Sequence, residues 1–256
     1  MEGPKNMQGR DRLALLTGAT GGIGRATAAR LAAMGYRLAL HYHRRPQEAA
    51  RLADGLPGGP HFAVAGDLAA PGAGDRLVAA VMKKSENIDI VVNNAGIFID
   101  HAPQVVAMEE WQRAWSRTLA VNLVAAADIA YAALPYFPTG GGKIINVSSR
   151  GAYRGEPQSP AYGASKAGMN SLTQSLARAL GGRGILVYGV APGWVETDMA
   201  ASHLDGPDGD AIRAQSPLNR AARPEEVAAT IAFLAGDDTD FLTGAIVDVN
   251  GASYFR

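Results

Sequence analysis

Short apolar runs alternate with helix-like segments along this chain of 256 residues, and that alternation restricts the folds it can adopt. Short β-branched and apolar runs bounded by turn residues are typical of buried strands, whereas longer Ala- and Leu-rich segments are typical of helices. Strands are expected at residues 13–17, 38–42, 62–65, 88–92, 143–147, 185–190 and 245–249. Helices are expected at residues 24–34, 46–53, 75–84, 109–136, 161–180 and 224–234.

Seven strands separated by helices predict a mostly parallel sheet, because a helical crossover returns the chain to the same end of the sheet. Right-handed crossovers make such a sheet doubly wound, with helices on both faces. No Pro/Gly-rich linker divides the chain, so a single α/β domain spanning residues 1–256 is expected. Ligands of such folds bind beyond the carboxyl ends of the strands.

Charge and cysteine content exclude several classes of function. Lys and Arg number 24, as do Asp and Glu, so there is no basic excess for nucleic acid or an anionic membrane. The chain has no cysteine, and its five histidines form no ligand cluster, so no metal site is expected. The N-terminus lacks the apolar stretch of a signal peptide, and Leu123–Leu134, interrupted by Asp128, is too short to span a bilayer. A cytoplasmic protein is expected.

A glycine-rich turn follows the first expected strand directly, in the sequence Thr17-Gly18-Ala19-Thr20-Gly21-Gly22-Ile23-Gly24. Glycines let a backbone approach a pyrophosphate closely, and the helix that starts there points free N–H groups at the phosphates. The turn therefore predicts a dinucleotide site. Its candidate residues are Gly18, Thr20, Gly21, Gly22, Ile23 and Gly24.

Three further motifs occur in order behind that turn: Asn93-Asn94-Ala95-Gly96, Tyr162-x3-Lys166 and Pro192-Gly193. Together with the glycine-rich turn they closely resemble the short-chain dehydrogenase/reductase family, in its branch of about this length. The resemblance covers residues 13–251. It implies a Rossmann-like sheet in the order 3-2-1-4-5-6-7 and an NADP(H)-dependent interconversion of ketone and secondary alcohol.

Tyr162 and Lys166 lie one turn apart on one face of the helix expected at 161–180. A nearby ammonium, together with a cationic nicotinamide, would lower the pKa of the phenol and make Tyr162 a general acid and base. Ser149 lies 13 residues before Tyr162, the separation that the family uses, so it is preferred over Ser148 as the hydrogen-bond donor to the substrate oxygen. The resemblance assigns Asn122 as the fourth catalytic residue, which connects the lysine to a water.

Cofactor preference is predicted from the end of the second strand. NAD sites usually place a carboxylate there, whereas this chain has Tyr42, followed by His43, Arg44 and Arg45. Because arginine binds phosphate bidentately, NADP(H) is favoured, and use of NAD(H) as well stays open. The resemblance adds further cofactor contacts at Asp67, Leu68, Asn94, Ala95, Gly96, Tyr162, Lys166, Pro192, Gly193, Val195 and Thr197.

Substrate contacts are expected from the segment between Ser149 and Tyr162 and from a mobile lid around residues 194–215. The preferred residues are Ser149, Tyr153, Gln158, Tyr162 and Trp194, with Phe98, His101, Glu156 and Pro157 as further candidates. The expected partner is a small carbonyl or alcohol substrate. The resemblance also implies a homotetramer, and the Ala-rich helices at 109–136 and 161–180 permit close packing between subunits.

Other functions remain open. The sequence around Pro192-Gly193 most resembles that of 3-oxoacyl-carrier-protein reductases, which attract an acidic carrier protein with surface arginines. Arg183 stands at one of those positions, but Gly140 stands at the other, so a free small molecule is preferred. A sugar or polyol dehydrogenase is a further alternative. An NADP(H)-binding sensor is disfavoured by the complete catalytic set, and an extended-branch epimerase by the absence of a C-terminal substrate domain.

Overall fold

A computed structural model describes residues 12–256, so the expectation about a signal peptide at the N-terminus lies outside the described residues. Within residues 12–256, seven strands form one sheet in the order β3-β2-β1-β4-β5-β6-β7, and every neighbouring pair is parallel. This confirms the predicted Rossmann-like α/β fold. The strands are β1 (Leu13–Leu16), β2 (Arg37–Tyr42), β3 (Phe62–Ala65), β4 (Ile90–Asn93), β5 (Gly142–Val147), β6 (Ile185–Pro192) and β7 (Ile246–Val249).

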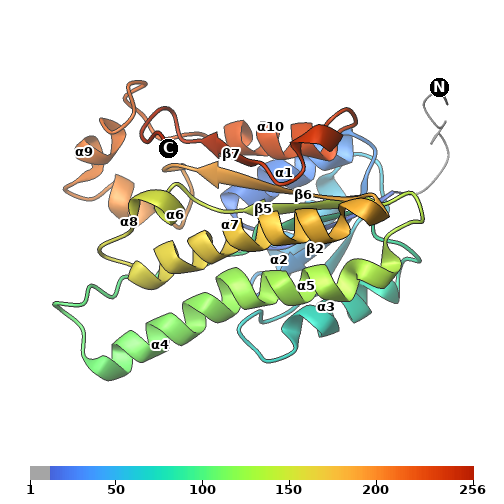
Figure 1. Cartoon of the computed structure of the whole chain (residues 1–256), viewed down its shortest axis with the longest axis horizontal. Helices are drawn as coiled ribbons and strands as arrows, with labels where there is room; N and C mark the ends of the chain where they lie inside the picture. Colours follow the sequence, from blue (N-terminus) through green and yellow to red (C-terminus); the bar gives the residue numbers. More distant parts are fainter. Residues whose placement is uncertain (1–11) are drawn as a thin grey trace.

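Helices cover both faces of the sheet (Figure 1). The helices α3 (Ala73–Met82), α5 (Ala125–Ala133) and α7 (Pro160–Leu180) contribute to the apolar cluster on one face. The helices α1 (Gly22–Ala33), α2 (Pro46–Gly55) and α10 (Pro224–Ala235) pack on the other face. Side chains of β1 alternate accordingly, because Leu13 and Leu15 enter the first cluster and Ala14 and Leu16 the second. Burial on both faces explains the continuous apolar runs of the strands.

The helix expected at residues 109–136 is a continuous helical run over Met108–Tyr136. It consists of α4 (Met108–Leu119), the π-helical turn η1 (Ala120–Val124), α5 and the 3-10 turn η2 (Leu134–Tyr136). The run is longer than the apolar stretch that the sequence delimits, and by length and composition alone it could cross a membrane. In this fold Val121, Ala125 and Ile129 pack into the first apolar cluster, which accounts for much of that apolar character.

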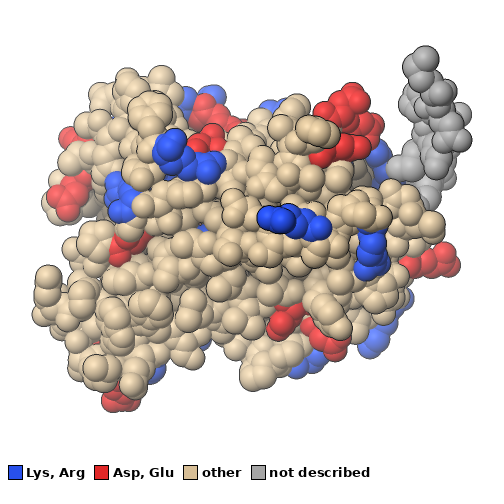
Figure 2. Space-filling view, viewed as in Figure 1, with Lys and Arg blue, Asp and Glu red and all other residues tan. Residues whose placement is uncertain are grey.

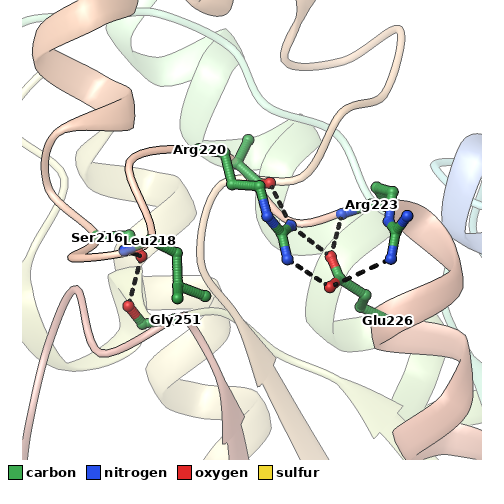
Figure 3. A network of polar contacts seen from close by, with 7 residues as sticks. Ser216, Leu218, Arg220, Arg223, Glu226 and Gly251 are labelled. Atoms are coloured by element: carbon green, nitrogen blue, oxygen red, sulfur yellow. Dashed lines mark hydrogen bonds and ion pairs between the residues drawn. The ribbon is translucent and has the colours of Figure 1, made fainter.

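The lid region lies at one end of the molecule, where α8 (Ala201–Leu204) and α9 (Gly209–Arg213) follow β6 (Figure 1). Ala200, Leu204 and Ala221 form a small apolar cluster of its own there. After α9, a polar network joins the chain to α10 and to the C-terminal loop (Figure 3). The remaining short helices are α6 (Gly151–Arg154), η3 (Gly181–Arg183) and η4 (Asp240–Leu242).

Figure 3 shows how this return is held. The Arg220 guanidinium donates two parallel hydrogen bonds of 2.7 Å to the Glu226 carboxylate. The same carboxylate accepts the backbone N–H of Arg223 and so caps α10. The hydrogen bonds from Arg220 lower the pKa of Glu226 to about 2. Ser216 donates to the carbonyl oxygen of Gly251 at 2.6 Å, which joins the lid exit to the C-terminal loop.

Candidate active site

Loops at the carboxyl ends of the central strands line two adjoining cavities. We call the first the outer cleft; it is lined mainly by the glycine-rich turn and by the loops after β2, β3 and β4. We call the second the inner pocket; it is lined mainly by segments after β4, β5 and β6 and by part of α7. The two share Ile23, Asn94, Gly96, Thr197 and Met199. Every predicted cofactor residue except Tyr42 lines one of these cavities.

Ser149, Tyr162 and Lys166 all line the inner pocket. The Ser149 side chain lies close enough to the Tyr162 hydroxyl to act on its pKa, which it lowers, and Lys166 Nζ lies 5.7 Å from the centroid of the Tyr162 ring. Ser149 Oγ accepts the backbone N–H of Gly151 at 3.0 Å, which leaves its hydroxyl proton for another acceptor. Lys166 Nζ donates to the carbonyl oxygen of Val147 at 2.7 Å. The three side chains thus converge at one place beyond β5.

Burial sets the protonation of this group. Burial raises the pKa of Tyr162 to about 12, opposite to the direction expected from the sequence. The same desolvation lowers the pKa of Lys166 to about 8. Both shifts favour the neutral form of the side chain, because charge is costly in a site shielded from water. A cation bound beside Tyr162 would act in the opposite direction on the phenol.

Asn122 lies in the π-helical turn η1 and is fully buried. Its Oδ1 accepts the N–H of Ile97 at 2.8 Å, and its Nδ2 donates to the carbonyl oxygen of Ile97 at 3.0 Å and to Ser165 Oγ at 3.1 Å. Asn122 lines neither cavity, so its side chain fixes the loop after β4. π-Helical turns often occur at functional sites, and its assignment to the catalytic set stays a prediction.

Gly18 and Gly24 of the glycine-rich turn leave no room for a side chain. A Cβ on Gly24 would lie 2.2 Å from the carbonyl oxygen of Gly18, and one on Gly18, with φ at +64°, 2.9 Å from Ala95 Cα. Gly21 is the N-cap of α1. Because it has no side chain, it does not cap the first N–H groups of that helix. A glycine cradle at an uncapped helix N-terminus fits the pyrophosphate of a dinucleotide.

Arg44 and Arg45 line the far end of the outer cleft, together with Arg117 from α4. Arg45 Nη1 lies 2.9 Å from Asp198 Oδ2 and 3.5 Å from Glu48 Oε2, so the arginine predicted to bind a phosphate is paired with carboxylates. His43 Nε2 lies 3.7 Å from Asp67 Oδ2. Tyr42 lines neither cavity. The sequence gives no local signal for Arg117 or Asp198, because both reach the cleft from distant segments.

Two predicted substrate residues lie elsewhere. Tyr153 on α6 stacks on Tyr254, with ring centroids 6.5 Å apart, and lies beneath the Arg256 guanidinium; it does not line the inner pocket. Gln158 also lies outside the lining, and its carbonyl oxygen accepts the N–H of His101 at 2.8 Å. The short helix α6 explains the placement of Tyr153, because it turns this residue toward the C-terminal loop.

Other side chains form the walls of the inner pocket. Trp194, as predicted from the sequence, lines it with Phe98 and Glu156. Phe98 packs edge-on against Tyr162, with ring centroids 4.8 Å apart. Arg150 also lines the pocket, a residue that sequence reasoning missed although it directly follows Ser149. Within residues 12–256, no group of three or more His, Cys, Asp or Glu side chains could hold a metal ion.

Comparison with known proteins agrees with this geometry. Residues 18–252 match the sequence model of the family described as Enoyl-(Acyl carrier protein) reductase. The 3-oxoacyl-[acyl-carrier-protein] reductase FabG of Staphylococcus aureus is 34% identical over 244 residues, which cover 94% of this chain and 97% of that protein. The 3-oxoacyl-[acyl-carrier-protein] reductase of Synechocystis sp. is 35% identical over 243 residues, covering 94% of this chain and 96% of the relative.

Solved structures agree as well. The angucycline C-6 ketoreductase LanV with bound NADP is 35% identical, with a TM-score of 0.85 over 94% of this chain and 95% of that one. A blue fluorescent protein from a metagenomic library, in complex with NADPH, is 33% identical, with a TM-score of 0.86 over 95% of this chain and 98% of that one. The chain belongs to the short-chain dehydrogenase/reductase family. It is an NAD(P)-dependent oxidoreductase.

Proposed function

We propose that this protein reduces a ketone to a secondary alcohol, or catalyses the reverse reaction, with Tyr162 as the group that gives or takes the proton. The observation that carries this proposal is the convergence of Ser149, Tyr162 and Lys166 in an inner pocket that opens beside the outer cleft. When bound, the nicotinamide supplies or accepts the hydride. The side chains of this chain have to orient the carbonyl and move the proton.

The proton step follows from the contacts of these side chains. A carbonyl oxygen seated at the Ser149 and Tyr162 hydroxyls accepts two hydrogen bonds, which stabilise the negative charge that develops on it. Tyr162 then transfers its proton to that oxygen. The Lys166 ammonium, held by the carbonyl oxygen of Val147, stabilises the phenolate that remains. The shielding that raises the pKa of Tyr162 also keeps its proton in place until the substrate arrives.

The outer cleft and the floor of the inner pocket would hold NADP(H). The N–H groups at the start of α1 would bind the pyrophosphate, and Arg44 and Arg45 the 2′-phosphate. Asp67 and Leu68 would border the adenine. The nicotinamide would be held by Pro192, Gly193, Val195 and Thr197, which line the inner pocket beside the catalytic side chains.

An apolar, ring-containing ketone suits the walls of the inner pocket best. Phe98 and Trp194 line the pocket, and the rings of both lie within 5.5 Å of the His203 ring, measured between centroids. Stacked and edge-on ring contacts favour flat apolar ligands. The angucycline C-6 ketoreductase among the similar structures acts on a ketone, as its name states, which supports the same class.

A 3-oxoacyl-carrier-protein reductase is the alternative, favoured by the named relatives. Arg183, the one arginine at an expected docking position, donates to the carbonyl oxygen of Leu134 at 3.0 Å. Lys and Arg side chains are scattered over the face drawn in Figure 2, without a continuous basic patch. Isolated exposed charges attract a partner weakly. These observations support a free substrate over one carried by a protein.

The deciding experiment measures NADPH oxidation with cyclic and aromatic ketones, and with acetoacetyl groups on acyl carrier protein and on coenzyme A. We expect the highest kcat/KM with a ring-containing ketone and similar values for the two thioesters. A large preference for the carrier-protein thioester that Arg183→Glu abolishes would assign the enzyme to fatty-acid elongation. Failure to oxidise NADPH with any carbonyl, despite NADPH binding, would support a sensor.

We also propose that the chain acts as a single domain and assembles as a cytoplasmic homotetramer. Val124 and Tyr131, on the helical run that includes α5, are 51% and 79% exposed. Exposed apolar side chains on one long helix favour contact with another subunit. Light scattering should give about four times the 26.6 kDa of the chain. A monomer at every concentration would overturn the assembly, and recovery in a membrane fraction would overturn the location.

A further inference from the structure

His41 is a buried histidine on β2 whose ring touches two backbone groups that belong to different loops. Its Nδ1 lies 3.1 Å from the backbone nitrogen of Gly18, and its Nε2 lies 3.1 Å from the carbonyl oxygen of Gly66. An N–H group only donates and a carbonyl oxygen only accepts, so the ring has to be neutral, with its proton on Nε2.

Both loops that His41 joins line the outer cleft. Gly18 is the first glycine of the phosphate-binding turn, and its carbonyl oxygen accepts the Asn94 side-chain amide at 3.1 Å. The next N–H of the turn, from Ala19, donates to the carbonyl oxygen of His41 itself at 2.9 Å. Gly66 directly precedes Asp67 on the opposite wall. The ring thus links the two walls and completes the hydrogen bonding of the Gly18 peptide.

We propose that His41 is a positioning residue for the cofactor: its neutral imidazole holds the glycine-rich turn and the loop after β3 at the spacing that the dinucleotide requires. This inference rests on the assignment of the outer cleft to NADP(H). A protonated ring would present an N–H to the N–H of Gly18, and two donors repel. Cofactor affinity should therefore fall when His41, which itself lines the outer cleft, gains a proton.

The surroundings of His41 make this loss visible only below neutral pH. Burial lowers the pKa of His41 below its ordinary value, so the ring is neutral at pH 7. The titratable groups nearest to it are His43, two residues along the chain, and Asp67, which lies 3.7 Å from His43. The glycine-rich turn and Asn94, packed on the other side, carry no titratable side chain.

The chain contains a matched control. His61 Nδ1 accepts the N–H of Leu38 at 3.1 Å, and its Nε2 lies 3.0 Å from the carbonyl oxygen of Pro57. The bonding pattern is that of His41, but Leu38 lies near the opposite end of β2, and His61 lines neither cavity. His61→Gln removes an imidazole with the same type of contacts away from the cofactor.

Calorimetric titration with NADP⁺ from pH 5 to pH 8 tests the proposal on four proteins: wild type, His41→Asn, His41→Gln and His61→Gln. Asparagine places an acceptor where Nδ1 was and does not titrate, whereas glutamine places its amide near the position of Nε2. At pH 8 we expect His41→Asn and His41→Gln each to bind NADP⁺ about tenfold more weakly than wild type, because each variant keeps only one of the two hydrogen bonds that join the loops.

The pH profile separates positioning from general stability. Below the pKa of His41, the wild-type Kd should rise toward about tenfold per pH unit relative to His41→Asn, because one proton has to be lost on binding. The 2′-phosphate titrates in the same range, but it cancels in a ratio of two proteins at equal pH. The profile of His61→Gln should follow wild type. NMR of the ring nitrogens in the cofactor-free protein should show a neutral His41 with its proton on Nε2.

Two results would overturn the inference: an acid limb in His41→Asn as steep as in wild type, or a proton on Nδ1 in the NMR spectrum. Failure of all four proteins to bind NADP⁺ at any pH would instead count against the cofactor assignment. Thermal unfolding at each pH checks that the variants are folded. A variant that is unfolded at pH 5 is compared with wild type between pH 6 and pH 8, where the same ratio applies.

Discussion

The outer cleft and the inner pocket are built in different ways although they share a wall. The part of the outer cleft at the glycine-rich turn is made of backbone held by buried hydrogen bonds; Thr17 Oγ1, for example, accepts the N–H groups of both Asn94 and Ala95 at 2.9 Å. The outer wall of the inner pocket consists of lid side chains with exposed contacts. Met199, which lines it, is 48% exposed, and behind the lining the lid residue His203 lies 3.5 Å from Asp100.

The two kinds of wall suit two kinds of ligand. A backbone cradle suits a ligand that never changes, because its geometry is set by glycines and strand ends rather than by side-chain rotamers. A wall of side chains on a loop can be altered without disturbing the sheet. We therefore expect substitutions in the outer cleft to affect every reaction of the enzyme, and substitutions in the lid to affect individual substrates.

The largest effect is expected in the inner pocket, at Tyr162. Tyr162→Phe removes the transferable proton, so turnover should fall by about 10²–10⁴, the usual contribution of a general acid. The Kd for NADPH should stay within about threefold of wild type, since the ring and its contacts remain. Steady-state kinetics and NADPH fluorescence measure the two quantities separately.

Tyr153→Phe is the comparison for that experiment. Tyr153 lies against Tyr254, outside the inner pocket, and its loss of a hydroxyl should change turnover less than twofold, as surface substitutions usually do. A loss comparable with that of Tyr162→Phe would return Tyr153 to the substrate site, where the sequence places it.

A large effect is also expected in the outer cleft from a single methyl group. A Cβ on Gly22 would lie 2.8 Å from Thr197 Cγ2, so Gly22→Ala should push the start of α1 and the lid base apart. We expect NADPH to bind about tenfold more weakly, in line with the cost of overpacking. Equilibrium fluorescence titration with NADPH measures this Kd.

Thr197→Ser tests the cause, because it removes Cγ2 and keeps the hydroxyl. The double variant Gly22→Ala/Thr197→Ser should recover most of the affinity, and the coupling between the two changes is read from a double-mutant cycle. Gly182→Ala is the control, since a Cβ there meets nothing within 4 Å. Purely additive effects would mean that the added methyl group acts on the cofactor directly.

The contrast between the cavities also explains what the sequence could predict. Glycine spacing and strand ends are local signals, and most of the residues that they single out line the outer cleft. Tyr162 and Lys166 were predicted for the same reason, since their spacing alone puts them on one face of α7. Arg117 and Asp198 reach the cleft from α4 and from the lid, and no local pattern encodes the path of those segments.

For Tyr153 and His41, the sequence does not predict the surroundings of the side chain. The sequence predicts Tyr153 as a substrate contact, but it does not line the inner pocket, and no local pattern indicates the contacts of His41. The direction of Tyr153 depends on the single turn of α6, which a residue pattern four residues long cannot define. The role of His41 depends on which loops pack beside β2, and therefore on the tertiary structure.

An effect of similar size, but limited to the choice between the two cofactors, is expected where Arg44 lines the outer cleft. Arg44→Ala should lower the ratio of kcat/KM for NADPH to that for NADH by about tenfold or more, the value of a charge-assisted hydrogen bond to phosphate. Rates with NADH should change little, because NADH has no 2′-phosphate. A ratio unchanged by this substitution would show that the two cofactors are distinguished elsewhere, with Arg117 as the next residue to test.

The smallest effect is expected at the ion pair between Arg45 and Asp198. Asp198 belongs to the lid base, and its carboxylate lies 2.9 Å from Arg45 and 4.0 Å from Arg25. If Arg45 binds the 2′-phosphate, Asp198 competes with that phosphate, so Asp198→Asn should strengthen NADPH binding. Both side chains are well exposed, and such pairs contribute at most about 1 kcal/mol, which limits the gain to about fivefold.

Ionic strength distinguishes this competition from its opposite, in which the pair closes the lid over the bound cofactor. The advantage of Asp198→Asn should shrink as salt is raised toward about 0.5 M, because exposed charges are screened over a few ångströms. It should also be absent for NADH, which has no phosphate to compete. Weaker binding of both cofactors by Asp198→Asn would instead mean that the Arg45–Asp198 pair holds the lid against the cleft, so that the backbone-built and the side-chain-built cavity act as one unit.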